Sequence, residues 1–438
     1  MVKSLKISIF IGYFKFYSDM IFNNYLSYNS LCERYFSVLK PLNKRHKEFF
    51  TSVLWLFLSI KGKINFLQIE RYGKLCEQSL RQWFGKPFDF LCFNSALVSD
   101  YCSERTVIGF DPTFIPKAGK KTHGVGRFWS GCAGAPKPGI EICGIAAIDL
   151  DNRTAMHLEA VQTVPKTNDL KSRRKNLIEC YVGMLTDRKT KLQEISNILV
   201  ADAYFSKETF VNPLCSAGFT VVSKLREDAR MTYIIEPVKT GKRGRPKTVG
   251  DKVDVRNLDM SHFTEIKTDD DNERTYTAIV KATALERNIR VVVVQKTTSK
   301  KTISVEIYFS TDTKMSADEI LEIYRTRFQI EFLYRDAKQH TGLTNCQARS
   351  KEKLHFHFNI SLTAVSVARA VHWFKTVGER SRTIEKEKRK EFSLSDIKTM
   401  NHNALLLNRF LCTFAINPNV LKNNQKVKEL LLFGTIAA

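Results

Sequence analysis

The chain contains 438 residues, of which 43% are hydrophobic and 26% are charged. At roughly 150 residues per domain this length allows about three domains, and the composition excludes a peptide module and a disordered tail. Lysine and arginine number 69 against 45 acidic residues, which gives a formal charge of +24. So basic a chain indicates a polyanionic partner, and nucleic acid is favoured over an anionic membrane surface.

The sequence shows no segment that would place the chain in or across a membrane. The longest apolar run, residues 53–60, falls well short of the ~20 residues that a membrane-spanning helix needs. No small-residue cleavage site follows the short apolar stretch near the N-terminus, so no signal peptide is predicted. The ten cysteines form no CxxC pair and no zinc-ligand cluster, so they are expected to be reduced core residues of a cytoplasmic protein.

The N-terminal residues 1–100 carry aromatic and aliphatic side chains at helical spacing and predict an all-helical domain. Within it, residues 64–84 outline two helices separated by Gly73. One interpretation is a DNA-binding helix-turn-helix whose second helix enters a major groove with Gln78 and Arg81 near base edges. The alternative is ordinary packing of two short helices.

From Thr106 the pattern changes to strands mixed with helices. The predicted strands are 106–110, 139–150, 154–161, 197–201 and 219–224, and the predicted helices are 168–191 and 207–217. This order predicts a mixed α/β sheet with helices on its faces. Residues 226–315 read instead as a β-rich insertion, with strands predicted at 276–281, 290–295 and 302–309.

A helix is predicted to start at Ser316, which has capping-box spacing to Glu319, and to run to Gly342. A second apolar helix is predicted at 354–375, followed by a linker of mixed charge at 379–391. The predicted domain organisation has five parts, at residues 1–100, 101–225, 226–315, 316–378 and 379–438.

Four residues of the helix after Ser316 share one face. Tyr324, Arg327, Glu331 and Lys338 lie at i, i+3, i+7 and i+14, which places them within about 60° of one another around the axis. Such a stripe is a poor core seam, because burying charges without partners costs several kcal/mol. Two interpretations stay open: Arg327 and Glu331 form a surface ion pair, or Glu331 binds a metal ion beside groups that hold phosphates.

Two aspartates favour the metal interpretation. Asp111 and Asp202 each follow a predicted strand, and the ends of strands in α/β sheets are where ligands and metals tend to bind. Together with Glu331 they would supply three oxygen ligands, which suits Mg²⁺. Two such ions about 3.5 to 4 Å apart can activate an attacking oxygen and stabilise the leaving oxygen in phosphoryl transfer.

At these residues the chain resembles the DDE transposases of bacterial insertion sequences, specifically the insertion sequence 4 family. The sequence around the first acid reads GFDPTFI (109–115), and that around the second reads ADAYF (201–205). The family signature of Tyr, Arg, Glu and Lys, separated by two, three and six residues, is met at every spacing by the stripe from Tyr324 to Lys338. The similarity covers residues 106–375.

The resemblance implies an RNase H-like catalytic core, interrupted by the β-rich insertion. Asp111, Asp202 and Glu331 would be the catalytic triad that binds two Mg²⁺ ions, with Mn²⁺ as a substitute. Tyr324, Arg327 and Lys338 would hold phosphates of the transposon end. The implied chemistry is strand cleavage by water, followed by attack of the freed 3′-hydroxyl on another phosphodiester.

The resemblance also implies the partners of the chain. These are double-stranded DNA, as transposon ends and as target, and a second copy of the chain in a homodimer that bridges paired ends at the bacterial nucleoid. Some relatives pass through a DNA hairpin. Since all four tryptophans lie outside the insertion, a flipped base would have to stack on a tyrosine or phenylalanine, or that route is not used.

A basic loop in the insertion, GKRGRPK (241–247), has a Gly-Arg-Pro core flanked by cations. Lys242, Arg243, Arg245 and Lys247 are expected to contact DNA in the manner of minor-groove hooks. The alternative is a mobile basic loop. For the whole chain, the alternatives to a transposase are an RNase H-like nuclease or junction resolvase, and a DNA-binding protein without catalysis.

Overall fold

The computed structural model describes residues 23–164, 176–235, 249–266, 272–297, 303–373, 392–417, 421 and 424–436. The predicted basic loop with Lys242, Arg243, Arg245 and Lys247 lies outside the described residues, as does nearly all of the predicted charged linker. None of the described helices is both long and apolar enough to cross a lipid bilayer. All ten cysteines are free thiols, as predicted, but the prediction that they are core residues is wrong for Cys76 and Cys132, which are exposed.

The elements follow the predicted order. The helices are α2 (Asn23–Phe36), α3 (Lys44–Ser59), α4 (Phe66–Tyr72), α5 (Glu77–Trp83), α6 (Phe90–Tyr101), α7 (Leu177–Thr186), α8 (Lys189–Gln193), α9 (Glu208–Ser216), α10 (Ala317–Thr326), α11 (Gln329–His340), α12 (Lys351–Ala368), α13 (Leu394–Thr413) and α14 (Gln425–Leu432). The strands are β1 (Thr106–Pro116), β2 (Gly126–Ser130), β3 (Ala135–Asp149), β4 (Thr154–Thr163), β5 (Ile198–Ala201), β6 (Thr220–Leu225), β7 (Met231–Ile234), β8 (Val249–Lys252), β9 (Thr264–Ile266), β10 (Glu273–Ala282), β11 (Arg287–Thr297) and β12 (Ile303–Ser310).

The central part of the sheet has the strand order β4-β3-β1-β5-β6. β1 pairs antiparallel with β3 and parallel with β5, and β5 pairs parallel with β6. Three antiparallel strands are thus followed by two that run parallel to the first. The RNase H-like mixed sheet predicted from the sequence is confirmed, and the structure adds β2, which the sequence analysis did not find.

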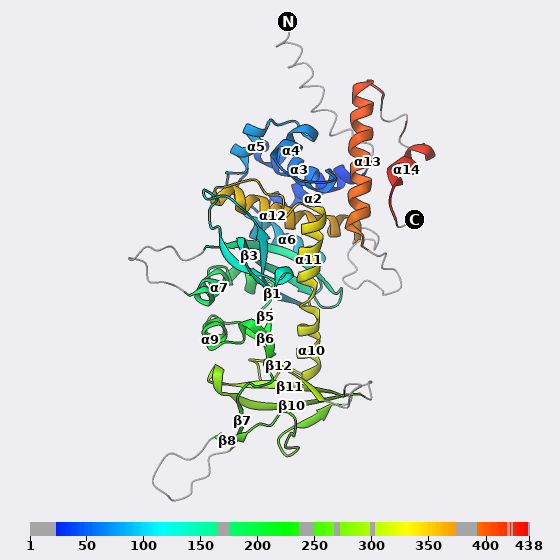
Figure 1. Ribbon diagram of the computed structural model, residues 1–438. Coiled ribbons are helices and arrows are strands. Elements are labelled where there is room, and N and C mark those ends of the chain that lie inside the picture. The colour runs from blue at the N-terminus through cyan, green and yellow to red at the C-terminus, as the bar shows by residue number, and fades with distance from the viewer. Residues whose placement is uncertain are drawn as a thin grey trace, which may run out of the picture.

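The insertion continues this sheet rather than forming a separate layer. β12 pairs antiparallel with β6, and β11, β10, β7 and β8 follow in turn. All described strands therefore belong to one twelve-stranded sheet. In Figure 1 the insertion lies at one end of the molecule, and the N-terminal helices lie at the other. The three predicted strands of the insertion are confirmed as β10, β11 and β12, whereas β7, β8 and β9 were not predicted.

The described part of the N-terminal domain is all-helical, as predicted, and its core is rich in phenylalanine. The rings of Phe50 and Phe88 stack with centroids 4.1 Å apart. α12 connects this core to the sheet because it packs against α3 on one side and β4 on the other. From Leu354 onward it is buried nearly all round, so polar side chains such as Asn359 and Ser361 are buried together with the apolar ones.

The predicted helix from Ser316 to Gly342 is wrong as a single element. Ser316 caps α10 by accepting the Glu319 backbone N–H, and Gly342 ends α11 with a φ of +70°, as expected. Between them, however, the chain turns at Arg327 and Phe328, where several hydrogen bonds join residues three apart as well as four apart. Both residues keep right-handed dihedral angles, so the segment is a local tightening of the helix. The predicted helix at 168–191 is likewise divided, into α7 and α8, within its described part.

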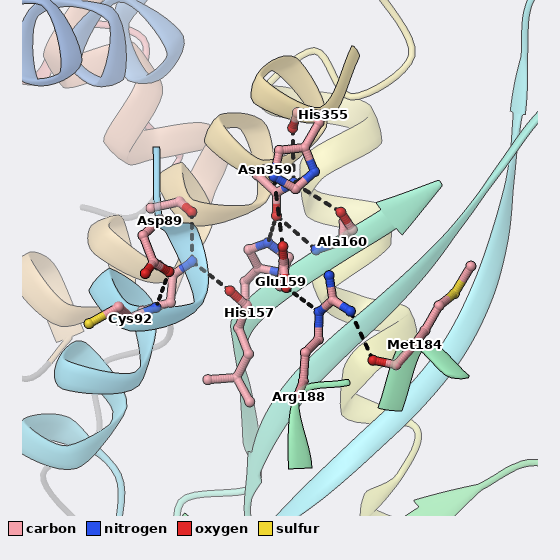
Figure 2. Close-up of polar contacts among 12 residues, drawn as sticks. Asp89, Cys92, His157, Glu159, Ala160, Met184, Arg188, His355 and Asn359 are labelled. Atoms are coloured by element: carbon pink, nitrogen blue, oxygen red, sulfur yellow. Dashed lines mark hydrogen bonds and ion pairs between the residues drawn. The ribbon is translucent and has the colours of Figure 1, made fainter. Parts of the chain in front are cut away.

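α12 is fixed to β4 by a buried polar network, shown in Figure 2. The Asn359 side chain accepts the Ala160 N–H at 2.7 Å and donates to the Ala160 carbonyl at 3.0 Å. Its Oδ1 also lies 3.0 Å from Nε2 of His157, so this ring nitrogen carries the proton. Beside it, Glu159 forms an ion pair with Arg188. A β-bulge in the β3–β4 pairing accommodates this cluster.

Two buried histidines make the stability of this region sensitive to acid. Burial lowers the pKa of His157 to about 3 and that of His357 to about 4, from an ordinary value of 6.5. At pH values between these lowered pKa values and 6.5, the folded protein therefore binds fewer protons than the unfolded chain. Their contribution to stability is complete above about pH 6.5 and is lost as the pH falls toward the folded pKa.

We predict that His157→Gln, which keeps a donor for Asn359, makes stability less sensitive to acid. Below about pH 6.5, each buried histidine that stays neutral lowers the free energy of unfolding by about 1.4 kcal/mol per pH unit. On acidification from about pH 6.5 to about pH 5, the free energy of unfolding should therefore fall by about 2 kcal/mol less in the variant than in wild type. Chemical denaturation at the two pH values measures this difference. His262→Gln, at an exposed ring in the insertion, is the control, and equal acid sensitivity in all three proteins would contradict the prediction.

Candidate active site

The sheet register places the two aspartates side by side. The parallel pairing of β1 with β5 ends with Phe110 opposite Ala201. Asp111 and Asp202 are the residues that come directly after this pair in the sequence. Phe110 is completely buried, and its ring packs against that of Phe205. Because side chains alternate along a strand, Asp111 points to the opposite face, on which α11 packs against β1.

One expectation about Asp111 is corrected by this geometry. β1 does not end at Asp111 but continues to Pro116, and Asp111 pairs with Gly144 of β3. What ends there is the pairing with β5, which is too short to reach beyond Ala201. Asp202 does follow directly after its strand, as predicted.

The helical face predicted from the spacing does approach the two aspartates. Glu331 lies in the first turn of α11, and Arg327 lies at the turn between α10 and α11. Nη2 of Arg327 is 3.1 Å from Oε1 of Glu331 and 3.9 Å from Oδ1 of Asp202. A single guanidinium nitrogen thus lies within 4 Å of two of the three carboxylates.

Arg327 is the buried member of this group. Its side chain is 12% exposed, whereas those of Asp202 and Glu331 are 46% and 40% exposed. Burial disfavours its charge, but the surrounding acids, with Asp202 contributing most, raise the pKa of Arg327 above its ordinary value. The arginine is therefore the permanent counter-charge of the cluster.

Asp111 is the most buried of the three acids. Its pKa is raised to about 7, above all by burial and also by the charges of Glu331 and Asp202, whereas the charges of Arg327 and Lys338 oppose this shift. Among the described residues, the Asp111 carboxylate has no hydrogen-bond or ion-pair partner. A half-buried carboxylate without a partner is unfavourable when charged, and a bound cation would stabilise it.

The residue types of the cluster fit a hard divalent cation, because three carboxylates from three different elements lie within electrostatic reach of one another. Their arrangement is not that of a closed coordination shell. Within the described parts of the chain, no three His, Cys, Asp or Glu side chains are grouped so as to hold a metal ion. The guanidinium of Arg327 takes the place of a cation for two of them.

Tyr324 and Lys338 complete the face. The Tyr324 hydroxyl donates to Oδ1 of Asp202 at 3.3 Å, and burial raises the pKa of this tyrosine to about 12. Nζ of Lys338 donates to Oγ1 of Thr113 at 2.7 Å, two residues beyond Asp111 on β1. All four residues of the stripe are therefore brought to the two aspartates, although the helix between them is not continuous.

Tyr334 is a positioning residue that the sequence analysis missed. Its hydroxyl donates to the backbone carbonyl of Asp111 and accepts the Gly144 N–H at 2.9 Å. These bonds hold α11 against the strand that carries the first acid. The available signal was its place three residues after Glu331, on nearly the same face of the helix.

Gly144 makes this approach possible. A Cβ atom at this position would lie 2.1 Å from the Tyr334 hydroxyl oxygen, far inside contact distance. A second anchor lies on the same helix, where Asp336 forms a buried ion pair with Arg369 at 2.9 Å. α11 is thus fixed to the sheet and to the end of α12 before any ligand binds.

The predicted helix-turn-helix residues lie elsewhere. α4 and α5 form as expected, but they are in the N-terminal domain and do not contribute to the cluster of acids. Arg81 forms an ion pair with Glu77 and lies 4.6 Å over the ring of Phe66, so it is held on the surface of its own domain. Gln78 is exposed. Contact of these residues with DNA stays a prediction.

We predict that the Tyr334 hydroxyl and Gly144 act as one unit. Tyr334→Phe removes both hydrogen bonds of the hydroxyl to backbone groups and should lower the free energy of unfolding by about 1 to 3 kcal/mol. Gly144→Ala should cost more, because the new methyl group overlaps the ring. The double variant should be less destabilised than the sum of the two changes, since losing the hydroxyl relieves part of the overlap.

Denaturant unfolding of the three variants measures these effects. Tyr204→Phe, whose ring is half exposed, is the control and should change stability by less than about 0.5 kcal/mol. Strictly additive losses in the double variant would show that the two positions are not coupled.

Comparison with known proteins gives one family. A family model described as a transposase DDE domain matches residues 103–367, which is more than half of the chain and includes every acid of the cluster. A search of curated proteins found no matching sequence.

Proposed function

Because the chain belongs to the DDE transposase family, we propose that it binds the inverted repeats at transposon ends and catalyses strand cleavage and strand transfer with two metal ions. The observation that carries the proposal is the convergence of Asp111, Asp202 and Glu331 on the face where Arg327 lies. Asp111 supports it too, because its half-buried carboxylate has no hydrogen-bond or ion-pair partner among the described residues, which is unusual for a purely structural ion-pair cluster.

In this proposal Asp111, Asp202 and Glu331 hold Mg²⁺, or Mn²⁺ in its place. The bound ions would supply Lewis-acid activation of water or a 3′-hydroxyl and stabilisation of the leaving oxygen. Arg327 carries a permanent charge beside the same carboxylates, with more N–H donors than its ion pairs use. It is therefore placed to hold a phosphate oxygen next to the reacting group.

Lys338 and Tyr324 flank the cluster and extend this surface. Lys338 is held near Asp111 through Thr113, and Tyr324 is held near Asp202. Both present donors, which phosphate oxygens accept. We expect them to fix the register of the strand to be cut, because phosphate contacts position a duplex without reading its sequence.

Cutting two transposon ends in a concerted way needs two active sites. We therefore expect a homodimer on paired ends. The basic loop at 241–247 and the surface of α5 with Gln78 and Arg81 are the candidate contacts with DNA outside the catalytic site. The net charge of +24 is consistent with such an extended interface.

We predict that Asp111→Asn, Asp202→Asn and Glu331→Gln each reduce cleavage by about a thousandfold or more, because the metal contributes several kcal/mol to the transition state. The assay uses labelled DNA that carries the sequences flanking the reading frame, with Mg²⁺, and separates cleaved from joined strands. Binding of the same DNA in EDTA should persist in all three variants.

Asp187→Asn, at an exposed carboxylate next to α7, is the control and should cleave like wild type. Full activity in any one of the three variants would remove that residue from the triad. Cleavage without strand joining would favour the nuclease or resolvase alternative, and DNA binding without either reaction would favour a non-catalytic DNA-binding protein.

A further inference from the structure

A cationic pocket lies at the C-terminal end of α11, the end that points away from the acids. It has a volume of about 560 Å³ and is bounded by the turn between α3 and α4, the C-terminal end of α11 and the N-terminal turns of α13. Four lysines line it, Lys61, Lys63, Lys338 and Lys398, and His340 is a fifth basic group. No aspartate or glutamate is among its lining residues.

The lysines of this pocket come from distant parts of the sequence. Lys61 and Lys63 are exposed on either side of Gly62, whose φ of +86° forms the turn. Lys398 lies in the second turn of α13. Four lysines that line one hollow, with no acid among the lining residues, create a positive potential that favours an anion. The N-terminus of α13 adds a partial positive charge at the same place.

Lys398 is the most informative member. It is only 6% exposed, and its ammonium group contacts two backbone carbonyls, those of His340 and Phe57. No carboxylate in the described part of the chain pairs with it. Burial lowers its pKa to about 7. A buried ammonium without a full counter-charge lowers stability, so its presence is better explained by an anionic ligand than by packing.

The pocket shares Lys338 with the candidate active site, since Lys338 lines the pocket and also donates to Thr113, two residues beyond Asp111. Glu331 and His340 lie near opposite ends of α11. At 1.5 Å per residue they are about 14 Å apart along the helix axis. This distance corresponds to about four base-pair steps of 3.4 Å.

We propose that this pocket binds backbone phosphates of duplex DNA about four base pairs from the phosphodiester that is cut. The inference rests on the proposed function, since it takes the DNA to be the substrate of the acidic cluster. It assigns a role to the meeting of α3, α11 and α13, which Figure 1 shows beside one another near the N-terminal helices. A free phosphate compound has the same chemistry, and the experiment distinguishes the two.

The test measures DNA binding by the full chain as a function of salt, by fluorescence anisotropy with a labelled duplex of about 30 base pairs. The pocket variant is Lys61→Glu combined with Lys63→Glu. The control is Lys40→Glu combined with Lys44→Glu, which makes the same change of charge at two exposed lysines of the same domain outside the pocket.

We expect the pocket variant to bind at least about tenfold more weakly, and its salt slope to fall by about 1.8, which is 0.9 for each of two phosphates. The control should keep the wild-type slope. Equal losses in both variants would overturn the proposal, because the effect would then be one of net charge. An unchanged slope in the pocket variant would overturn it as well.

Lys398→Met separates binding from folding. If Lys398 serves DNA, the variant should melt at the wild-type temperature or above it, while its salt slope falls by about 0.9. If Lys398 only ties α13 to α11, the variant should melt lower and keep the slope, and the proposal fails for this residue. Melting with millimolar inorganic phosphate or ATP tests the other source. Stabilisation that the pocket variant loses, together with unchanged DNA binding, would assign the pocket to a free phosphate compound.

The two proposals fail in distinguishable ways. If the chain is not catalytic, the protein with its triad intact shows no cleavage, yet the pocket variant still shows the altered salt slope. A catalytic chain with no role for the pocket would show cleavage, together with equal slopes in the pocket variant and its control.

Discussion

The structure of the acidic site depends on one electrostatic constraint, which is that three carboxylates cannot approach one another without positive charge between them. Arg327 meets this constraint for Asp202 and Glu331. Its position follows from the tightened turn between α10 and α11, which places the arginine between the two helices that carry the rest of the stripe. Asp111 is left as the half-buried acid without a direct partner in the described chain, and this asymmetry is the reason for our proposal that a further cation binds there.

The backbone holds the acids in place before any ligand arrives. The β1–β5 register aligns Asp111 with Asp202. Tyr334 ties α11 to β1 and β3 through backbone atoms, and the ion pair of Asp336 with Arg369 ties it to the end of α12. Side chains that are fixed by packing and hydrogen bonds keep their geometry when a charged substrate binds. Catalytic power in such a site comes mainly from this prior positioning.

The sequence alone predicted the order of strands and helices along the core, and it singled out as candidates the three acids that the fold brings together, because strand alternation, the residues after strands and helical spacing are local signals. It did not predict the break at Arg327, since the dihedral angles there stay helical and no glycine or proline marks the turn. It also missed the role of Tyr334, which depends on Gly144 lying about 190 positions away across a sheet. The pocket around Lys398 could not be predicted from the sequence for the same reason, because its lysines are far apart in the chain and become neighbours only in the folded protein.

The pairing of β12 with β6 has a consequence for how this kind of protein can change length. The insertion extends the sheet through backbone hydrogen bonds between β12 and β6 and is not merely joined to it by a linker. Excising it would leave β6 with an open row of amide and carbonyl groups, which is the feature that drives edge-to-edge association of sheets. Evolution can therefore shorten this region hairpin by hairpin from the outer strands inward, but it cannot discard the whole block without supplying β6 with a new neighbour.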